Sequence, residues 1–208
     1  MRASRRPPED IACIALLHAY APWLELGGAS DGVAEHVDAV ECTLVRRTSG
    51  DLDVVTRHGP VPMAHLLGIL PAHVNIHVHV PDSLAAAPLV QLSRTTETSH
   101  RFTFIARHMG VMQVTALMEH RIAIALETED AETAKDFIQD QIVDAIVCSP
   151  KVADDEVMLL SWEKRTRVYV GVLDTREEIL EWIEKGADGI RTRNPALFLQ
   201  ALGPRLIA

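Results

Sequence analysis

The chain has 208 residues, a length typical of one domain. With 48% apolar and 24% charged residues, its composition is that of a globular protein and excludes a disordered or collagen-like chain. The 20 Lys and Arg residues against 29 Asp and Glu give a formal net charge of -9, which argues against a protein that binds nucleic acid by neutralising phosphates.

Short β-branched apolar runs alternate with amphipathic stretches along the chain. Eight runs are candidate strands: Ile11–Leu17, Val37–Val45, Val74–Val80, Arg101–Arg107, Arg121–Glu127, Asp144–Ser149, Val168–Asp174 and Asp188–Thr192. Their polarity hardly alternates, which is typical of parallel strands that are covered on both faces. After the second run, Leu52–Thr56 follows the turn Ser49–Asp51 and predicts one arm of an inserted hairpin.

The later connections predict helices over Ala131–Gln141, Asp154–Lys164 and Thr175–Lys185. The last of these begins at a candidate N-cap, Asp174 or Thr175, and ends at Gly186. Eight strand–helix units predict an α/β fold, a (β/α)8 TIM barrel over residues 1–208 that is small for a class spanning ~200 to over 400 residues. A doubly wound open sheet is the alternative, although the sequence has no GxGxxG or GxxxxGK[ST] motif.

The three cysteines, Cys13, Cys42 and Cys148, are widely spaced and form no CxxC pair. This pattern argues against a disulfide framework and favours free thiols in a reducing compartment, so we expect a cytoplasmic protein. No apolar stretch reaches the ~20 residues of a membrane span, so we expect no membrane anchor. The basic and then apolar start is similar to a signal peptide, but Glu9 and Asp10 interrupt it. We expect mature protein there, with a signal peptide as the alternative. No feature of the sequence predicts an oligomeric state.

Histidine is unusually frequent, with 10 residues against nine aromatic ones (Trp 3, Tyr 2, Phe 4). Side chains at the carboxyl ends of barrel strands form the active site in this fold. Several histidines and charged residues fall at such ends: His18, His58, His77, His79, His108, Arg107, Glu127, Arg191 and Arg193. Because side chains alternate along a strand, Glu41 and Thr43 share one face of the second strand. The sequence predicts a site rich in imidazole at the barrel mouth.

The order and spacing of these residues resemble the glycerophosphodiester phosphodiesterase family. The family's closing pattern, Gly-Val-Asp-Gly-Ile-x-Thr-Asp-x-Pro, is similar to Gly186–Pro195, which is GADGIRTRNP here. The segments Val37–Val45 and Val168–Asp174 support the resemblance, which is weak over 82–120. It implies a phosphodiesterase that hydrolyses a glycerophosphodiester or a related small phosphate ester.

The resemblance also implies roles for individual residues. His18 and His58 match the two family histidines that act as general acid and base, and Glu41 matches a metal-binding carboxylate. Other positions depart from the family pattern: Ala19 and Tyr20 replace Arg and Gly, Thr43 replaces Asp, His77 and His79 replace Glu and Lys, Gly59 replaces Asp, and Arg193 replaces Asp. Two of three expected metal-binding carboxylates are therefore lost.

The departures predict an altered metal site and a less acidic mouth. Hard Mg²⁺ and Ca²⁺ prefer oxygen ligands, whereas imidazole suits Zn²⁺. If a divalent metal binds, we expect Glu41 and His77 to hold it, at a weak site. We expect His79 and Arg193 to bind the substrate phosphate through charge-assisted hydrogen bonds.

Three functions remain open from the sequence. The first is hydrolysis by His/His acid–base catalysis. The second is a catalytically inactive barrel that binds a phosphate-bearing ligand or a protein partner. The third is a lyase or isomerase, because barrels host many reactions. An equal alternative to a metal or phosphate site is that His77 and His79 fill the top layer of the barrel, with Glu41 as a counter-charge for a histidinium.

Overall fold

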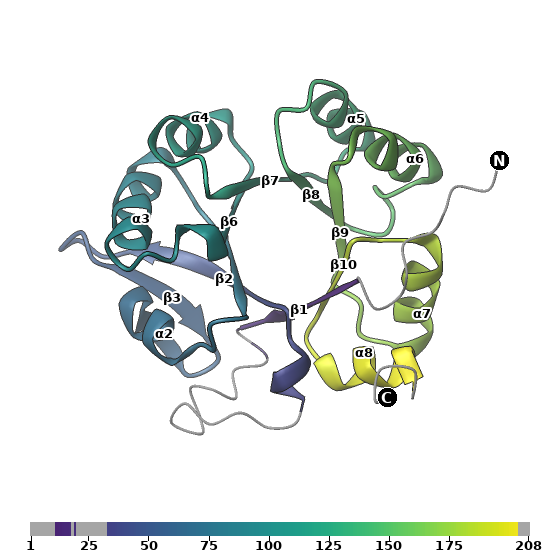
Figure 1. Ribbon diagram of the computed structural model, residues 1–208, viewed down its shortest axis with the longest axis horizontal. Coiled ribbons are helices and arrows are strands. Elements are labelled where there is room, and N and C mark those ends of the chain that lie inside the picture. The colour runs from purple at the N-terminus through teal and green to yellow at the C-terminus, as the bar shows by residue number, and fades with distance from the viewer. Residues whose placement is uncertain (1–10, 18, 20–32, 204–208) are drawn as a thin grey trace.

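A computed structural model describes residues 11–17, 19 and 33–203, and it confirms the (β/α)8 barrel (Figure 1). Eight parallel strands form a ring in the order β1-β10-β9-β8-β7-β6-β5-β2, and β1 also pairs with β2, which closes the ring. The strands are β1 (Ala12–Leu16), β2 (Ala39–Arg46), β5 (Asn75–His79), β6 (Phe102–Ala106), β7 (Ala123–Glu127), β8 (Ala145–Cys148), β9 (Arg167–Gly171) and β10 (Gly189–Thr192). The observed strands lie within or beside the predicted runs. The largest difference is that β9 ends at Gly171 and not at Asp174.

The predicted hairpin is also present. Strands β3 (Leu52–Thr56) and β4 (Gly59–Pro62) pair antiparallel with each other, and β3 pairs with the end of β2. The hairpin thus extends β2 beyond the ring, on the side of the barrel where the parallel strands end.

Helices surround the ring on the outside (Figure 1). They are α2 (Met63–Ile69), α3 (Ser83–Thr95), α4 (Met109–Met118), α5 (Ala131–Gln139), α6 (Asp155–Lys164), α7 (Arg176–Lys185) and α8 (Pro195–Leu202), with 3-10 turns η2 (Ala34–His36) and η3 (Ser99–Arg101). Thr175 is the N-cap of α7, because its side chain accepts a hydrogen bond from the Glu178 amide, and Gly186 ends that helix at a φ of 83°. None of the helices described is long and apolar enough to cross a bilayer.

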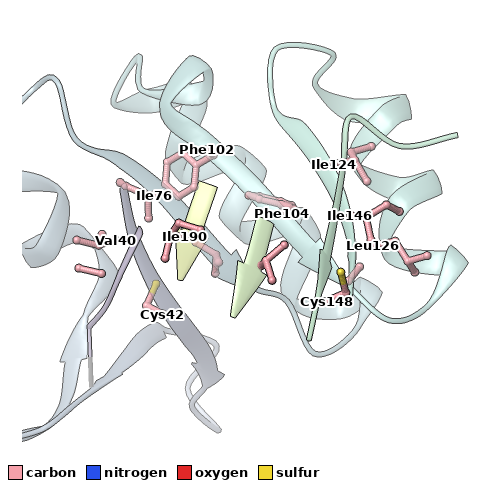
Figure 2. Packing of buried hydrophobic residues seen from close by; sticks show 14 of the residues in the cluster. Val40, Cys42, Ile76, Phe102, Phe104, Ile124, Leu126, Ile146, Cys148 and Ile190 are labelled. Carbon is pink, nitrogen blue, oxygen red and sulfur yellow. The ribbon is translucent and has the colours of Figure 1, made fainter. Parts of the chain in front are cut away.

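Alternation along the strands creates two apolar layers. The outward-facing side chains pack under the helices, where Figure 2 shows Val40, Cys42, Ile76, Phe104 and Ile146 among others. The inward-facing layer is smaller and contains Ile14, Ala39, Ile105, Ala125, Ala145, Val147 and Tyr169. Cys42 therefore faces the helices, as expected for a neighbour of the inward-facing Glu41 and Thr43.

Aspartates fasten the strands at the amino-terminal end of the ring. Each accepts a hydrogen bond from a backbone amide of the neighbouring strand: Asp38 from Cys13, Asp144 from Ile124 and Asp188 from Val168, at 2.7 to 2.8 Å. These partly buried bonds satisfy strand amides that the ladder leaves open. At the amino-terminal end of the ring, these three carboxylates therefore have a structural role.

Candidate functional site

A buried ion pair joins two strands at the carboxyl end of the ring. Glu41 on β2 accepts two hydrogen bonds from Arg191 on β10: Arg191 Nε lies 2.7 Å from Oε2 and Nη2 lies 2.6 Å from Oε1. The third guanidinium nitrogen, Nη1, donates to the Gly171 carbonyl at 3.2 Å. The two side chains are only 5% and 9% exposed. Such a bidentate pair is geometrically specific and strong.

The pair continues into a chain of charges across the mouth. On β5, His79 Nε2 lies 2.9 Å from Glu41 Oε1, and its Nδ1 lies 3.3 Å from Glu127 Oε2. Arg107, after β6, donates from Nε to the same Glu127 oxygen at 2.7 Å. We call these five residues, Arg107, Glu127, His79, Glu41 and Arg191, the mouth network. With His79 protonated it contains three cations and two anions.

The partners in the mouth network keep one another charged. Burial alone raises the pKa of Glu41, but hydrogen bonds from Arg191 and His79 hold that pKa well below its usual range. For His79, burial works in the opposite direction, yet the hydrogen bonds to Glu127 and Glu41 raise its pKa to about 9. Hydrogen bonds from His79 and Arg107 likewise overcome burial and lower the pKa of Glu127 to about 2. At neutral pH the network therefore has one excess positive charge.

The raised pKa of His79 predicts a loss of stability in alkali. Its folded-state pKa of about 9 lies above the ~6.5 of an unfolded histidine, so its contribution is complete below about pH 6.5 and disappears as the pH rises through about 9. We expect the unfolding free energy of the wild type to fall by on the order of 2 kcal/mol between about pH 6 and pH 10, relative to His79→Gln. Urea unfolding of both proteins across this range measures the difference. Parallel pH profiles for the two proteins would contradict a charged His79.

Two cavities open onto the mouth network. The first has a volume of about 400 Å³ and is lined by Thr43, His79, Val80, Pro81, Ile105, Arg107, His108, Glu127 and Arg191. The second, of about 420 Å³, lies between the network and the hairpin and is lined by Leu16, Glu41, Cys42, Thr43, Val55 and His79. Each has the size of a small-molecule site.

His77 and His79, which the sequence predicts to lie together in the site, line different cavities. His79 lies in the mouth network, whereas His77 lies deeper in the barrel, with its ring 5.0 Å from that of Tyr169, and lines a cavity of about 270 Å³ at the amino-terminal end. The His77 Nδ1 atom is buried and has no hydrogen-bond partner among the described residues. Burial lowers the pKa of His77 to about 4. His77 is therefore a neutral interior residue.

The other predicted site residues, Arg193, His58 and His18, are not part of the mouth network. Arg193 follows β10 and pairs with Asp174, with Nε 2.7 Å from Oδ2. His58 is exposed in the turn between β3 and β4, where Arg57 Nε donates to its Nε2 at 3.1 Å, and it does not line either mouth cavity. His18 lies outside the described residues.

The expected metal ligands do not fit a divalent cation. Both oxygens of Glu41 are bound by Arg191, so a metal at this carboxylate would meet a guanidinium. His77 lines the opposite cavity, and no group of three His, Cys, Asp or Glu side chains within the described ranges is arranged to hold a metal. Hard cations need several oxygen ligands, and at this mouth the carboxylates of Glu41 and Glu127 are already engaged by Arg191 and Arg107.

Sequence reasoning missed the roles of Arg107, Glu127 and Arg191. All three fall at predicted strand ends, and Arg191 lies two residues before Arg193, which the sequence predicts, together with His79, to bind the substrate phosphate. The signal was present in the alternation along β10, because Arg191 follows Gly189 at a spacing of two and so faces the barrel interior.

Comparison with known proteins shows similarity at the level of structure. No family model matches the chain, and no curated protein matches it. A candidate glycerophosphoryl diester phosphodiesterase from Silicibacter pomeroyi superimposes with a TM-score of 0.81 at 10% identity, with 95% of each chain covered. A glycerophosphodiester phosphodiesterase from Parabacteroides distasonis gives 0.71 at 12% identity, covering 94% of this chain and 98% of that one.

A third similar structure contains a ligand. It is an Oleispira antarctica phosphodiesterase in complex with its product sn-glycerol-3-phosphate, with a TM-score of 0.75 at 10% identity and coverage of 92% of this chain and 96% of that one. At sequence identities this low, the structural similarity establishes the fold alone. The chain has the (β/α)8 fold of the glycerophosphodiester phosphodiesterases.

Proposed function

We propose that the barrel mouth binds a small phosphate ester of the glycerophosphodiester class and that the chain hydrolyses it. The observation that carries the proposal is the mouth network, which places one excess positive charge beside a cavity of about 400 Å³. A phosphate diester is a compact anion that such a site would attract. The Oleispira antarctica phosphodiesterase, which has the same fold, is described with a phosphate monoester as product.

Arg107 is the best-placed ligand for the phosphate. Its side chain is 62% exposed, lines the first cavity and uses Nε for Glu127. The other nitrogens of a guanidinium form a fork that matches two phosphate oxygens. His79 has carboxylates at both ring nitrogens, so it supplies fixed positive charge and not a transferable proton.

Hydrolysis then requires an acid and a base from outside the mouth network. Following the resemblance, we assign these roles to His18 and His58. One histidine would take a proton from the attacking hydroxyl or water as the new oxygen–phosphorus bond forms. The other would protonate the departing alkoxide as its bond to phosphorus breaks. The hairpin that carries His58 packs beside the mouth, since Val55 on β3 lines the second cavity.

A second candidate function is binding without hydrolysis. It is favoured by the pairing of Glu41 with Arg191, because the carboxylate that the resemblance assigns to metal is already engaged. In this case the protein would bind the same anion through Arg107 and release it unchanged.

Measuring both ester binding and ester turnover on the same protein distinguishes hydrolysis from binding without hydrolysis. Calorimetric titration uses glycerol 3-phosphate and glycerophosphocholine, and ³¹P NMR follows hydrolysis of the second compound. We expect Arg107→Ala to weaken binding by ~10- to 100-fold, because it removes a charge-assisted hydrogen bond. We expect His58→Ala to retain binding and lose ~100-fold or more of the turnover.

The control is Arg121→Ala. Arg121 is also half-exposed and bound to a buried carboxylate, that of Glu119, but it precedes β7 at the opposite end of the barrel. Its loss should leave ester binding unchanged. Binding by the wild type without turnover would support the second function, and no binding of either ester would contradict both.

A further inference from the structure

A guanidinium lies at the carboxylate where the resemblance expects a divalent metal. Arg191 Nε and Nη2 approach the two Glu41 oxygens at 2.7 and 2.6 Å, and both side chains are almost fully buried. His79 adds a further contact to Oε1 at 2.9 Å. The negative charge of Glu41 is therefore balanced from within the chain.

The neighbouring strand β9 supplies a further partner for the Arg191 guanidinium. Gly171 on β9 lies opposite Arg191 in the sheet, and its carbonyl accepts the Nη1 hydrogen bond. A Cβ atom at position 171 would lie 2.4 Å from the Arg191 carbonyl oxygen and 2.7 Å from the Arg191 Cβ. Glycine at position 171 thus permits the close approach of the β10 backbone. Its carbonyl completes the set of partners, so each of the three guanidinium nitrogens of Arg191 has a defined acceptor.

We propose that Arg191 is the resident cation of the mouth and replaces a divalent metal at Glu41. The positive charge at this point is then covalently part of the chain. A guanidinium has fixed donors and does not dissociate from the protein, so chelators cannot remove it, and its positive charge repels a metal that approaches Glu41. The consequence for ligand binding rests on the proposed function: the ester would bind without any added metal.

The first test is metal binding by the unmodified protein. Mn²⁺ titration followed by electron paramagnetic resonance, and calorimetry with Mg²⁺, Ca²⁺ and Zn²⁺, should detect no site tighter than ~1 mM, the weak end of protein calcium sites. A tighter site that is lost in Glu41→Gln would overturn the proposal. This test uses no ester, so its result stands whether or not the proposed function is correct.

The second test changes the charge at position 191. Arg191→Met removes the charge with little loss of volume, and we expect it to bind Mn²⁺ more tightly than ~1 mM and to be stabilised by it, because Glu41 then lacks its guanidinium. Arg191→Lys keeps a positive charge and should bind no Mn²⁺. A folded Arg191→Met protein without Mn²⁺ binding, or Mn²⁺ binding by Arg191→Lys, would contradict the proposal. If Arg191→Met does not fold, the lysine variant and the wild-type titration still decide the question.

The third test addresses the ester. Titration with glycerol 3-phosphate in the presence and absence of EDTA should give dissociation constants that agree within twofold. Loss of binding in EDTA that is restored by a divalent metal would overturn the role of Arg191. Absence of binding under both conditions would count against the proposed function alone.

Discussion

Replacing Glu41 with leucine is expected to lower the free energy of unfolding by about 3–5 kcal/mol. The change removes the carboxylate that binds Arg191 and one of the two that bind His79, so two cations are left inside the barrel. An unpaired buried charge is costly, whereas an apolar pair of similar volume can replace an ion pair with little loss. Urea or guanidinium unfolding of the wild type and the variant measures the difference.

A double variant separates charge burial from simple loss of packing. Glu41→Leu combined with Arg191→Met is expected to regain at least half of the stability that Glu41→Leu loses, because no unpaired charge remains at that pair. The matched control is Arg193→Met, which breaks the more exposed pair with Asp174 and should cost less than about 1 kcal/mol. A cost below about 1 kcal/mol for Glu41→Leu would show that the buried pair does not hold the barrel together.

Gly171→Ala is expected to have the second large effect. The added methyl would meet the backbone oxygen of Arg191 at 2.4 Å, and a backbone atom in a paired strand cannot move aside. The φ of Gly171, 153°, is also one that side-chain-bearing residues rarely adopt. We expect a loss of ~1–3 kcal/mol or more, the range for overpacking, measured by chemical denaturation.

Gly68→Ala is the matched control for this change. Gly68 lies in α2, and a Cβ there would have open space around it. Because alanine favours a helix over glycine, this variant should be neutral or more stable by up to ~1 kcal/mol. Equal effects of the two substitutions would rule out the close approach at position 171 as the cause.

The sequence predicts most of this fold because the strands are encoded locally. Each apolar run is long enough and β-branched enough to identify its strand, and a period of two places Glu41 and Thr43 on the inner face. Both ends of α7 follow from local chemistry as well: Thr175 is its N-cap and Gly186 ends it.

The site could be predicted only in part, because its central ion pair joins residues that are far apart in the sequence. Glu41 and Arg191 lie 150 residues apart and meet only because the ring closes. A one-dimensional pattern identifies both residues as inward-facing but does not say that one neutralises the other. The sequence also does not give the depth of a side chain inside the barrel. His77 and His79 share a face of β5, yet two residues along a strand span ~7 Å, which is enough to place them in different cavities.

Closure of the ring has a consequence for the order of events during synthesis. Strand β1 pairs with β2 on one edge and with β10 on the other, so Ala12 lies beside Gly189. While the chain is being made, β1 can at first pair only with β2, and its second edge stays open until β10 has been made. Open strand edges are templates for wrong pairing, and late long-range closure is entropically slow. Among the described strands, β1 is thus made first and enclosed last, and its open edge is exposed to mispairing until β10 pairs with it.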